Sequence, residues 1–214
     1  VLTEELLDEL DLADFCLAGI QVVTAQERVP TRLDLAVMRR IKETLERVQR
    51  RRLTGDETWL TMVTYDRLAL TRLTLDRLVI NTDSTMKLVI IDNASTDGTR
   101  RWLRENAHRY PFIHKVIFMD RNLGIGRALN NGLLYSMSRG RRVGRLDNDI
   151  LVPPFWLRDL NHVLDSPLGP KVVCGLVTDD PVVNEIVAHG RTCLVDDLRV
   201  YQVETIGGCC NVYD

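Results

Sequence analysis

The sequence predicts an α/β protein: a doubly wound, mainly parallel sheet flanked by helices, with an N-terminal helical appendage. From residue 58 onward, short apolar segments typical of strands alternate with segments that have the apolar periodicity of helices. The segment Lys87–Ile91 is apolar on both faces, as in a parallel sheet covered by helices on both sides. Polar residues cluster after the strand-like segments, which is where such sheets bind ligands.

The composition fits one large domain, or one domain with an appendage, in a chain of 214 residues. A formal net charge of -2, from 28 basic and 30 acidic residues, gives no reason to expect nucleic acid as a partner. No apolar run is long enough for a transmembrane segment, and no signal-peptide pattern is present. The five cysteines form no Cys-x-x-Cys pair and are expected to be reduced, so the sequence favours a cytoplasmic protein, peripheral at a membrane at most.

Residues 1–57 are expected to form a helical appendage without chemistry of its own. Apolar residues recur at helical spacing over 6–17 and again over 38–48, on either side of Pro30. The arginines at 50–52 are interpreted as a solvated helix end, where cations suit the helix dipole. The two apolar stripes are expected to pack on the following domain or on a partner subunit. In the second case the protein would be a homo-oligomer. Because the chain does not begin with Met, we expect it to be a piece of a longer protein.

The next part of the chain predicts two strand-to-helix units. Strands are expected at 59–64, 87–91 and 116–119, with one helix over Leu68–Ile80 and another after Gly98. The order β-α-β-α-β implies right-handed crossovers, which bring the carboxyl ends of the strands to one edge of the sheet. The polar residues expected at that edge are Thr64, Tyr65, Asp66, Asp92, Asn93, Ser95 and Asp97.

The loop after the second strand can serve a nucleoside. Asp92 is placed to accept a hydrogen bond from a base N–H group, and Asp97 from ribose hydroxyls. The loop is also rich in residues that start helices, so Asp97 or Ser95 can cap the helix that begins there. The two interpretations are compatible, because one residue can cap the helix while another faces the ligand.

A Gly124-Ile125-Gly126 turn joins the third strand to a helix that is predicted to reach about Arg139. The turn lacks the third glycine of the dinucleotide-binding fingerprint and follows the third strand instead of the first, so a dinucleotide site is discounted. A turn of small residues still lets the backbone approach a ligand closely.

Asp147 and Asp149 follow the fourth predicted strand, 143–146, and reach the same edge as Asp92. If the chain is extended there, both carboxylates point to one side and repel each other unless a cation lies between them. Mg²⁺ and Mn²⁺ meet that need, since they bind through one or two carboxylates and take water and phosphate oxygens as their other ligands. Alone, such a pair is more often a solvated turn, so its interpretation depends on the preceding motifs.

Four motifs occur in a fixed order along the chain. They are Thr64-Tyr65-Asp66-Arg67, then Val89 to Thr99, then Asn122-Leu123-Gly124 with Asn130 and Gly132, and finally Leu146-Asp147-Asn148-Asp149 with Pro153 and Trp156. In this order they resemble the family 2 glycosyltransferases of GT-A fold, over about residues 58–160. One departure is Asp66, where the family usually has Asn. The resemblance implies that residues 58–214 form a GT-A nucleotide-sugar-binding domain, incomplete at its C-terminal acceptor side.

A nucleoside-diphosphate sugar is the donor that this resemblance implies, with a sugar or glycoconjugate as acceptor. Thr64 and Tyr65 would line the base, and Asp92 would hydrogen-bond the base, most often uracil. Asp97 would lie near the nucleoside. The other candidates for the nucleotide-sugar site are Asp66, Asn93, Gly124 and Asn130.

A metal cofactor, Mn²⁺ or Mg²⁺, is also implied by the resemblance. Asp147 would lie against the ribose or the metal, and Asp149 would hold the cation on the diphosphate. The cation would neutralise the charge that develops on the departing nucleoside diphosphate. Arg127 and Arg145 are phosphate candidates, although an arginine in such a place is more often a surface residue.

The acceptor side is less complete. Further strands are expected at 172–177, 194–195 and 200–203, the last two as an antiparallel pair, and Val203–Cys210 resembles the family's strand and glycine turn beside the donor sugar. In inverting members a carboxylate further along acts as general base, so this catalytic residue is expected beyond Asp214. The candidates by elimination are Asp179, Asp180 and Glu204.

The expected function is an inverting, metal-dependent glycosyltransferase of polysaccharide or glycoconjugate biosynthesis, with a UDP sugar as the expected donor. A sugar nucleotidyltransferase shares the sheet, but would carry a Gly-rich basic loop where Tyr65–Leu68 stands. A non-catalytic nucleotide-sugar-binding or scaffold domain fits a chain without an identified base. A dinucleotide oxidoreductase is the least favoured alternative.

Overall fold

The computed structural model describes residues 57–169, 172–175, 185, 188–203 and 210–214. The expected helical appendage, residues 1–57, lies outside the described residues apart from Glu57. Within the described ranges, no helix combines the length and the apolar character that crossing a bilayer requires.

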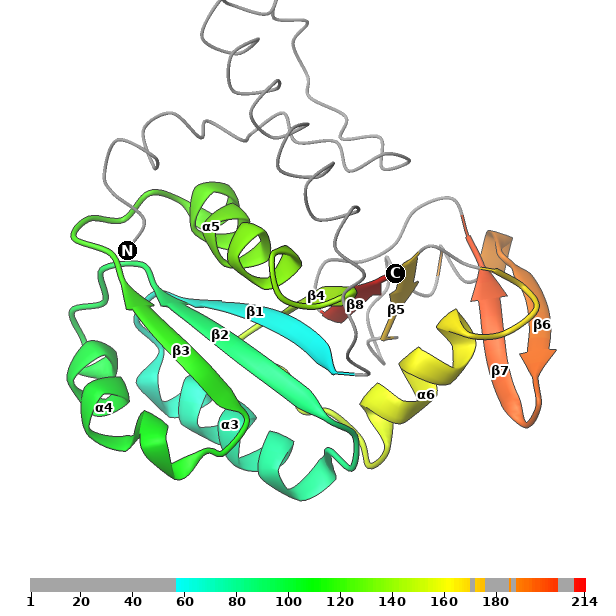
Figure 1. Cartoon of the computed structure of the whole chain (residues 1–214), viewed down its shortest axis with the longest axis horizontal. Helices are drawn as coiled ribbons and strands as arrows, with labels where there is room; N and C mark the ends of the chain where they lie inside the picture. The colour runs from blue at the N-terminus through cyan, green and yellow to red at the C-terminus, as the bar shows by residue number, and fades with distance from the viewer. Residues whose placement is uncertain (1–56, 170–171, 176–184, 186–187, 204–209) are drawn as a thin grey trace, which may run out of the picture.

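A six-stranded sheet forms the centre of the fold, with the strand order β3-β2-β1-β4-β8-β5 (Figure 1). The strands β1 to β4 run parallel, and β8 runs antiparallel to both of its neighbours. The predicted doubly wound, mainly parallel sheet is therefore confirmed. The bounds of its strands are β1 Thr58–Thr64, β2 Met86–Asp92, β3 Ile113–Phe118, β4 Arg142–Leu146, β5 Val172–Cys174 and β8 Cys210–Tyr213.

Helices cover both faces of the sheet, with α5 on one face and α3 and α6 on the other (Figure 1). A separate antiparallel hairpin, β6 Arg191–Val195 and β7 Leu198–Gln202, confirms the strands expected near 194–195 and 200–203. The helices are α3 Leu68–Asn81, α4 Thr99–Asn106 with the 3-10 turn η2 Ala107–Arg109, α5 Ile125–Met137 and α6 Trp156–Leu164.

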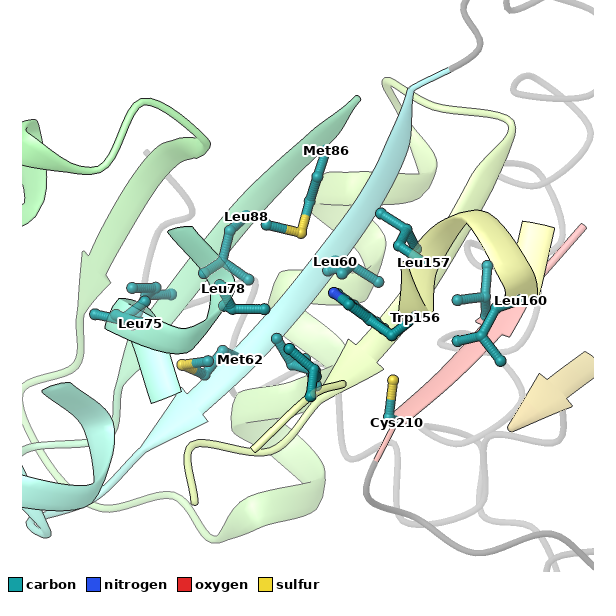
Figure 2. Close-up of a cluster of buried hydrophobic side chains, with 14 of the residues drawn as sticks. Leu60, Met62, Leu75, Leu78, Met86, Leu88, Trp156, Leu157, Leu160 and Cys210 are labelled. Carbon is teal, nitrogen blue, oxygen red and sulfur yellow. The ribbon is translucent and has the colours of Figure 1, made fainter. Parts of the chain in front are cut away.

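The larger apolar cluster lies between the sheet and the helices α3, α4 and α6 (Figure 2). Leu60 and Met62 point into it from β1 because alternate residues of a strand share one face. Leu75 and Leu78 of α3 and Leu157 of α6 meet them and are fully buried. Each such side chain contributes roughly 1.5–3 kcal/mol to stability.

The other residues of these strands form a second cluster on the opposite face. Trp59 and Val63 of β1 and Val89 and Ile91 of β2 pack there against Ala128 of α5. Both faces of β1 and β2 are therefore buried, which explains why the charged residue Asp92 appears only at the end of β2 and why the polar residues of β1 are all threonines.

Strand β3 differs from the prediction, which set it at 116–119. It begins earlier, at Ile113, and ends at Phe118. As the edge strand of the sheet, β3 is only partly buried, so polar His114 and Lys115 fit within it and conceal its beginning in the sequence.

Strand β8 was not predicted, and it separates β4 from β5. Its backbone approaches β4 so closely that a Cβ atom on Gly144 would lie 2.2 Å from the carbonyl oxygen of Asn211. Glycine is therefore needed at this position of β4. The glycines of the turn expected within Val203–Cys210, Gly207 and Gly208, lie outside the described residues.

Replacing Gly132 by alanine should destabilise the protein by about 1–3 kcal/mol, because overpacking forces the backbone to shift. Gly132 lies where α5 contacts β1, and a Cβ atom there would lie 2.2 Å from Cγ2 of Thr61. Thermal unfolding measures the change. Gly126→Ala on the same helix is the control: nothing lies within 4 Å of its Cβ position, so equal or higher stability is expected. Equal melting temperatures for both variants would contradict the close contact.

Candidate functional site

The predicted site residues meet at the carboxyl edge of the sheet. Thr64 and Asp92 end neighbouring strands and are paired in register, and the loop after β4 leaves the sheet at the same edge. Asn130 is the exception among the candidates, since it lies within α5 instead of on a loop. The candidates on the loops and strand ends of this edge are Thr64, Tyr65, Asp66, Asp92, Asn93, Asp97, Gly124, Asp147 and Asp149.

Asp92 is fully buried, and neither of its carboxylate oxygens has a partner at normal hydrogen-bond geometry among the described residues, although the hydroxyl and the N–H of Ser95 lie nearby. The guanidinium of Arg100 on α4 lies 3.6 Å from Oδ2. Burial raises the pKa of Asp92 above its usual value, while Ser95 and Arg100 act in the opposite direction. Leaving a buried polar group unsatisfied costs about 1–3 kcal/mol. Such a carboxylate is typical of a site that a ligand completes.

Asp97 has the opposite environment, because both of its oxygens accept hydrogen bonds from the chain. Oδ2 accepts from the backbone N–H of Leu68 (2.9 Å), and Oδ1 accepts from the N–H (3.0 Å) and the hydroxyl (2.6 Å) of Thr99. Burial acts to raise the pKa of Asp97, but the hydrogen bonds from Thr99 and Leu68 outweigh it and lower the pKa. Asp97 therefore holds the first N–H of both α3 and α4.

Asp66 ties the loop after β1 to the loop after β2. Its Oδ1 accepts from the N–H groups of Thr96 (2.7 Å) and Asp97 (3.2 Å), and its own N–H donates to Oγ of Ser95 (2.9 Å). Its φ of 56° lies in the left-handed region, which Asp and Asn adopt more readily than most residues. Aspartate therefore serves at this position in the way that asparagine can.

Asn148 is anchored in a buried cluster of threonines. Its Nδ2 donates to the hydroxyls of Thr64 (3.2 Å) and Thr71 (3.0 Å), and its backbone carbonyl accepts from the hydroxyl of Thr74 (3.0 Å). The chain turns at Asn148 and Asp149 as a result, so the extended conformation considered from the sequence is wrong. Thr64 is fully buried in this cluster, where it supports the Asp147-Asn148-Asp149 turn.

Each carboxylate of the Asp147-Asn148-Asp149 turn pairs with an arginine. Nε (2.9 Å) and Nη2 (2.8 Å) of Arg145 contact Oδ1 of Asp147, and Nη1 of Arg67 lies 2.6 Å from Oδ2 of Asp149. Burial raises the pKa of Asp147, Arg145 opposes that rise, and the negative charge of Asp149 adds to it. The two carboxylates are therefore close enough to interact. The contact of Arg67 with Asp149 was not predicted, and neither was the role of Asn148, because both depend on segments that are distant in the sequence.

The donor set at this turn fits a hard divalent cation that shares its ligands with a substrate. No group of three or more metal-binding side chains exists within the described ranges. Asp147 and Asp149 supply carboxylate oxygens, which Mg²⁺ and Mn²⁺ prefer, and both cations commonly take their remaining ligands from phosphates and water. The residues present thus fit a cation held jointly with a diphosphate.

Asn93 shapes the turn that leads into α5. Its Nδ2 donates to Oδ1 of Asn122 (2.9 Å), and its Oδ1 accepts from the N–H of Leu123 (2.9 Å). The N–H of Gly124 donates to the same Asn122 oxygen (2.8 Å), and its φ of 79° favours glycine. Tyr65, in contrast, is 46% exposed at the edge and is free to face a ligand.

The acceptor side contains no assigned base within the described residues. Asp214 follows β8, which runs antiparallel to β4, and it forms an ion pair with Arg141 at 2.6 Å, at the amino edge of the sheet. It is therefore far from the edge that carries Asp147. The other carboxylates considered, Asp179, Asp180 and Glu204, lie outside the described residues.

The family model described as Glycosyl transferase family 2 matches residues 59–203. A search of the curated proteins found no match.

Solved structures share the fold. The mannosyltransferase PcManGT from Pyrobaculum calidifontis, in complex with GDP-Man and Mn²⁺, is 19% identical with a TM-score of 0.55, covering 81% of this chain and 50% of that one. Residues 1–349 of TarS from S. aureus are 17% identical with a TM-score of 0.55, covering 73% and 46%. Their complex with UDP-GlcNAc is 19% identical with a TM-score of 0.51, covering 63% and 39%. The chain thus spans about half the length of these structures, or less.

Proposed function

The chain belongs to glycosyl transferase family 2, and from this premise we propose that it binds a nucleoside-diphosphate sugar and transfers the sugar to an acceptor hydroxyl with the help of a divalent cation. The donor would lie along the carboxyl edge of the sheet, with its base at Asp92 and its diphosphate at Asp147 and Asp149. The resemblance of the motifs to the family favours uridine as the nucleoside and inversion at the anomeric carbon.

The unsatisfied carboxylate of Asp92 is the observation that carries the proposal. A base with a ring N–H, such as uracil or guanine, would give this buried acceptor the partner that it lacks, provided that the groups covering Asp92 move aside. The mannosyltransferase of like fold holds GDP-Man with Mn²⁺, and TarS of like fold holds UDP-GlcNAc, which supports a nucleoside-diphosphate sugar in a fold of this kind.

The remaining residues divide into ligand contacts and supports. Tyr65 is exposed at the edge and would stack on the base. Asp66, Asn93 and Asp97 hold the surrounding loops, as their hydrogen bonds to neighbouring backbone groups indicate. Gly124 would let the backbone before α5 approach the donor closely.

In the transfer step, the acceptor hydroxyl oxygen forms a bond to the anomeric carbon while the bond from that carbon to the diphosphate oxygen breaks. The electron pair of the broken bond leaves with the nucleoside diphosphate, and the hydroxyl proton passes to a base. Asp147 and Asp149 would hold the cation, which when bound supplies charge neutralisation to the leaving diphosphate.

Calorimetric titration with UDP, GDP and dTDP, each with and without Mn²⁺, tests the proposal. We expect one of them, UDP in the first place, to bind only when Mn²⁺ is present. Failure of all three to bind to a sample with a native circular dichroism spectrum would leave the paired aspartates as an ordinary turn. Release of nucleoside diphosphate from the matching sugar nucleotide then separates an enzyme from a domain that only binds the donor.

A further inference from the structure

We propose that Arg67 is an exchangeable counter-charge: it neutralises Asp149 in the ligand-free protein and moves to the donor diphosphate when a divalent cation binds at Asp149. This inference rests on the proposed function, because it requires the cation and the diphosphate to meet at this edge.

The contact between Arg67 and Asp149 joins two loops that follow neighbouring parallel strands. Nη1 of Arg67 lies 2.6 Å from Oδ2 of Asp149, although the two residues are 82 positions apart in the sequence. The Arg67 side chain is 61% exposed and that of Asp149 is 34% exposed. Exposed ion pairs of this kind contribute little to stability, so the pair can open easily.

The backbone under Arg67 is fixed, whereas its side chain is not buried. The carbonyl of Arg67 accepts from the N–H of Thr71 (3.0 Å) at the start of α3, and the adjacent N–H groups of Asp66 and Leu68 donate to Ser95 and Asp97. Arg67 itself has a φ of 60°, in the left-handed region that non-glycine residues rarely adopt. A long side chain on a fixed base, beside the turn that carries both aspartates, can reach more than one anion at that turn.

Arg145 has a different relation to its partner and does not suit this exchange. It contacts Asp147 through two nitrogens, only two residues away, and its side chain is 26% exposed. That pair orients Asp147 from within its own segment. Arg67 makes a single contact with Asp149 from another loop, so it is the arginine that a cation would displace.

The chemistry of the two partners determines where Arg67 goes. A divalent cation and a guanidinium compete for the carboxylate of Asp149, because each needs its oxygen and the two positive charges repel. The diphosphate that arrives with the cation brings new anionic oxygens to the same turn. The planar donor fork of arginine matches phosphate oxygens well, so the displaced guanidinium gains a partner instead of losing one.

Two titrations of Arg67→Gln test the exchange, and their results should have opposite signs. In the first, Mn²⁺ is added to the nucleotide-free protein and free Mn²⁺ is measured by electron paramagnetic resonance. Without the competing charge, Arg67→Gln should bind Mn²⁺ about two- to fivefold more tightly than the wild type. In the second, the nucleoside diphosphate that the wild type binds is titrated at saturating Mn²⁺, and Arg67→Gln should bind it about tenfold more weakly.

Arg158→Gln is the matched control, and Arg67→Lys separates charge from shape. Arg158 forms a comparable exposed pair with Asp83, at the opposite edge of the sheet, and its removal should change neither affinity. Arg67→Lys keeps the charge and should bind Mn²⁺ as the wild type does. An Mn²⁺ affinity of Arg67→Gln equal to that of the wild type would overturn the exchange. The exchange would also be overturned if neither the wild type nor Arg67→Gln bound Mn²⁺ without nucleotide, although the wild type bound the nucleoside diphosphate in the presence of Mn²⁺. A wild type that binds no nucleoside diphosphate would instead overturn the proposed function.

Discussion

Asp149→Ala is expected to abolish Mn²⁺-dependent binding of the nucleoside diphosphate, with at least about a 100-fold loss of affinity, while the protein stays folded. A metal ligand that bridges protein and diphosphate contributes several kcal/mol, and each 1.4 kcal/mol corresponds to about tenfold in affinity. Asp149 is partly exposed, and its ion pair with Arg67 lies at the surface, so the free energy of unfolding should change by less than about 0.5 kcal/mol.

Calorimetry with and without Mn²⁺ measures the affinity, and thermal unfolding measures the fold. Asp83→Ala is the control, because Asp83 is 35% exposed and also pairs with an arginine, Arg158, but lies at the opposite edge of the sheet. Asp83→Ala should bind like the wild type. If Asp149→Ala kept its Mn²⁺-dependent binding, the cation would have to be held elsewhere.

Asp92→Asn should have two opposite effects: loss of nucleotide binding and a gain in the stability of the ligand-free protein. The neutral amide accepts through one atom only and is a weaker acceptor than a carboxylate, so the hydrogen bond from the base N–H should weaken and affinity should fall about tenfold. Because burial raises the pKa of Asp92, folding disfavours its charged form. Removing that charge should raise the melting temperature of the ligand-free protein at neutral pH.

The sign of the pH dependence follows from the raised pKa. Below the ordinary value of 3.8, Asp92 is protonated in both folded and unfolded states, so Asp92→Asn gains little there. As pH rises through the raised folded pKa, the wild type loses stability relative to the variant, and the difference in melting temperature should grow. Thermal scans from pH 4 to neutral pH measure this difference, and a variant less stable than the wild type at neutral pH would contradict the unsatisfied state of Asp92.

Asp97→Asn is the contrasting control on the same loop. Its carboxylate accepts hydrogen bonds on both oxygens and its pKa is lowered, so its stabilising effect is present above the unfolded pKa and is lost as pH falls through the folded pKa. Asp97→Asn should therefore lower the melting temperature at neutral pH, whereas Asp92→Asn raises it.

The sequence predicts those elements of the fold whose residues show a clear local pattern. β1 and β2 are evident because both faces are buried and their residues are mostly apolar or β-branched, and polar Asp92 then marks where the second strand ends. The position of Asp147 after β4 follows from the same reasoning. The beginning of β3 is not predicted correctly, because an edge strand accepts polar residues such as His114.

What the sequence does not predict depends on contacts between distant segments. β8 is defined by its pairing with β4 and β5, which no local pattern encodes. Asn148 contacts Thr64 across 84 positions, and Arg67 contacts Asp149 across 82. From the sequence, Asn148 has no predicted role between the two aspartates. In the structure, its hydrogen bonds to buried threonines hold the Asp147-Asn148-Asp149 turn in place.

β8 also determines what the sheet exposes while the chain is being synthesised. Because β8 pairs with β4, a nascent chain that has been synthesised only as far as α6 leaves β4 without its outer neighbour. An unpaired strand is a template for pairing with other chains, and Gly144 adds no side chain that would shield the middle of this one. Between synthesis of α6 and synthesis of β8, the emerging chain therefore carries an open strand edge of the kind that promotes aggregation.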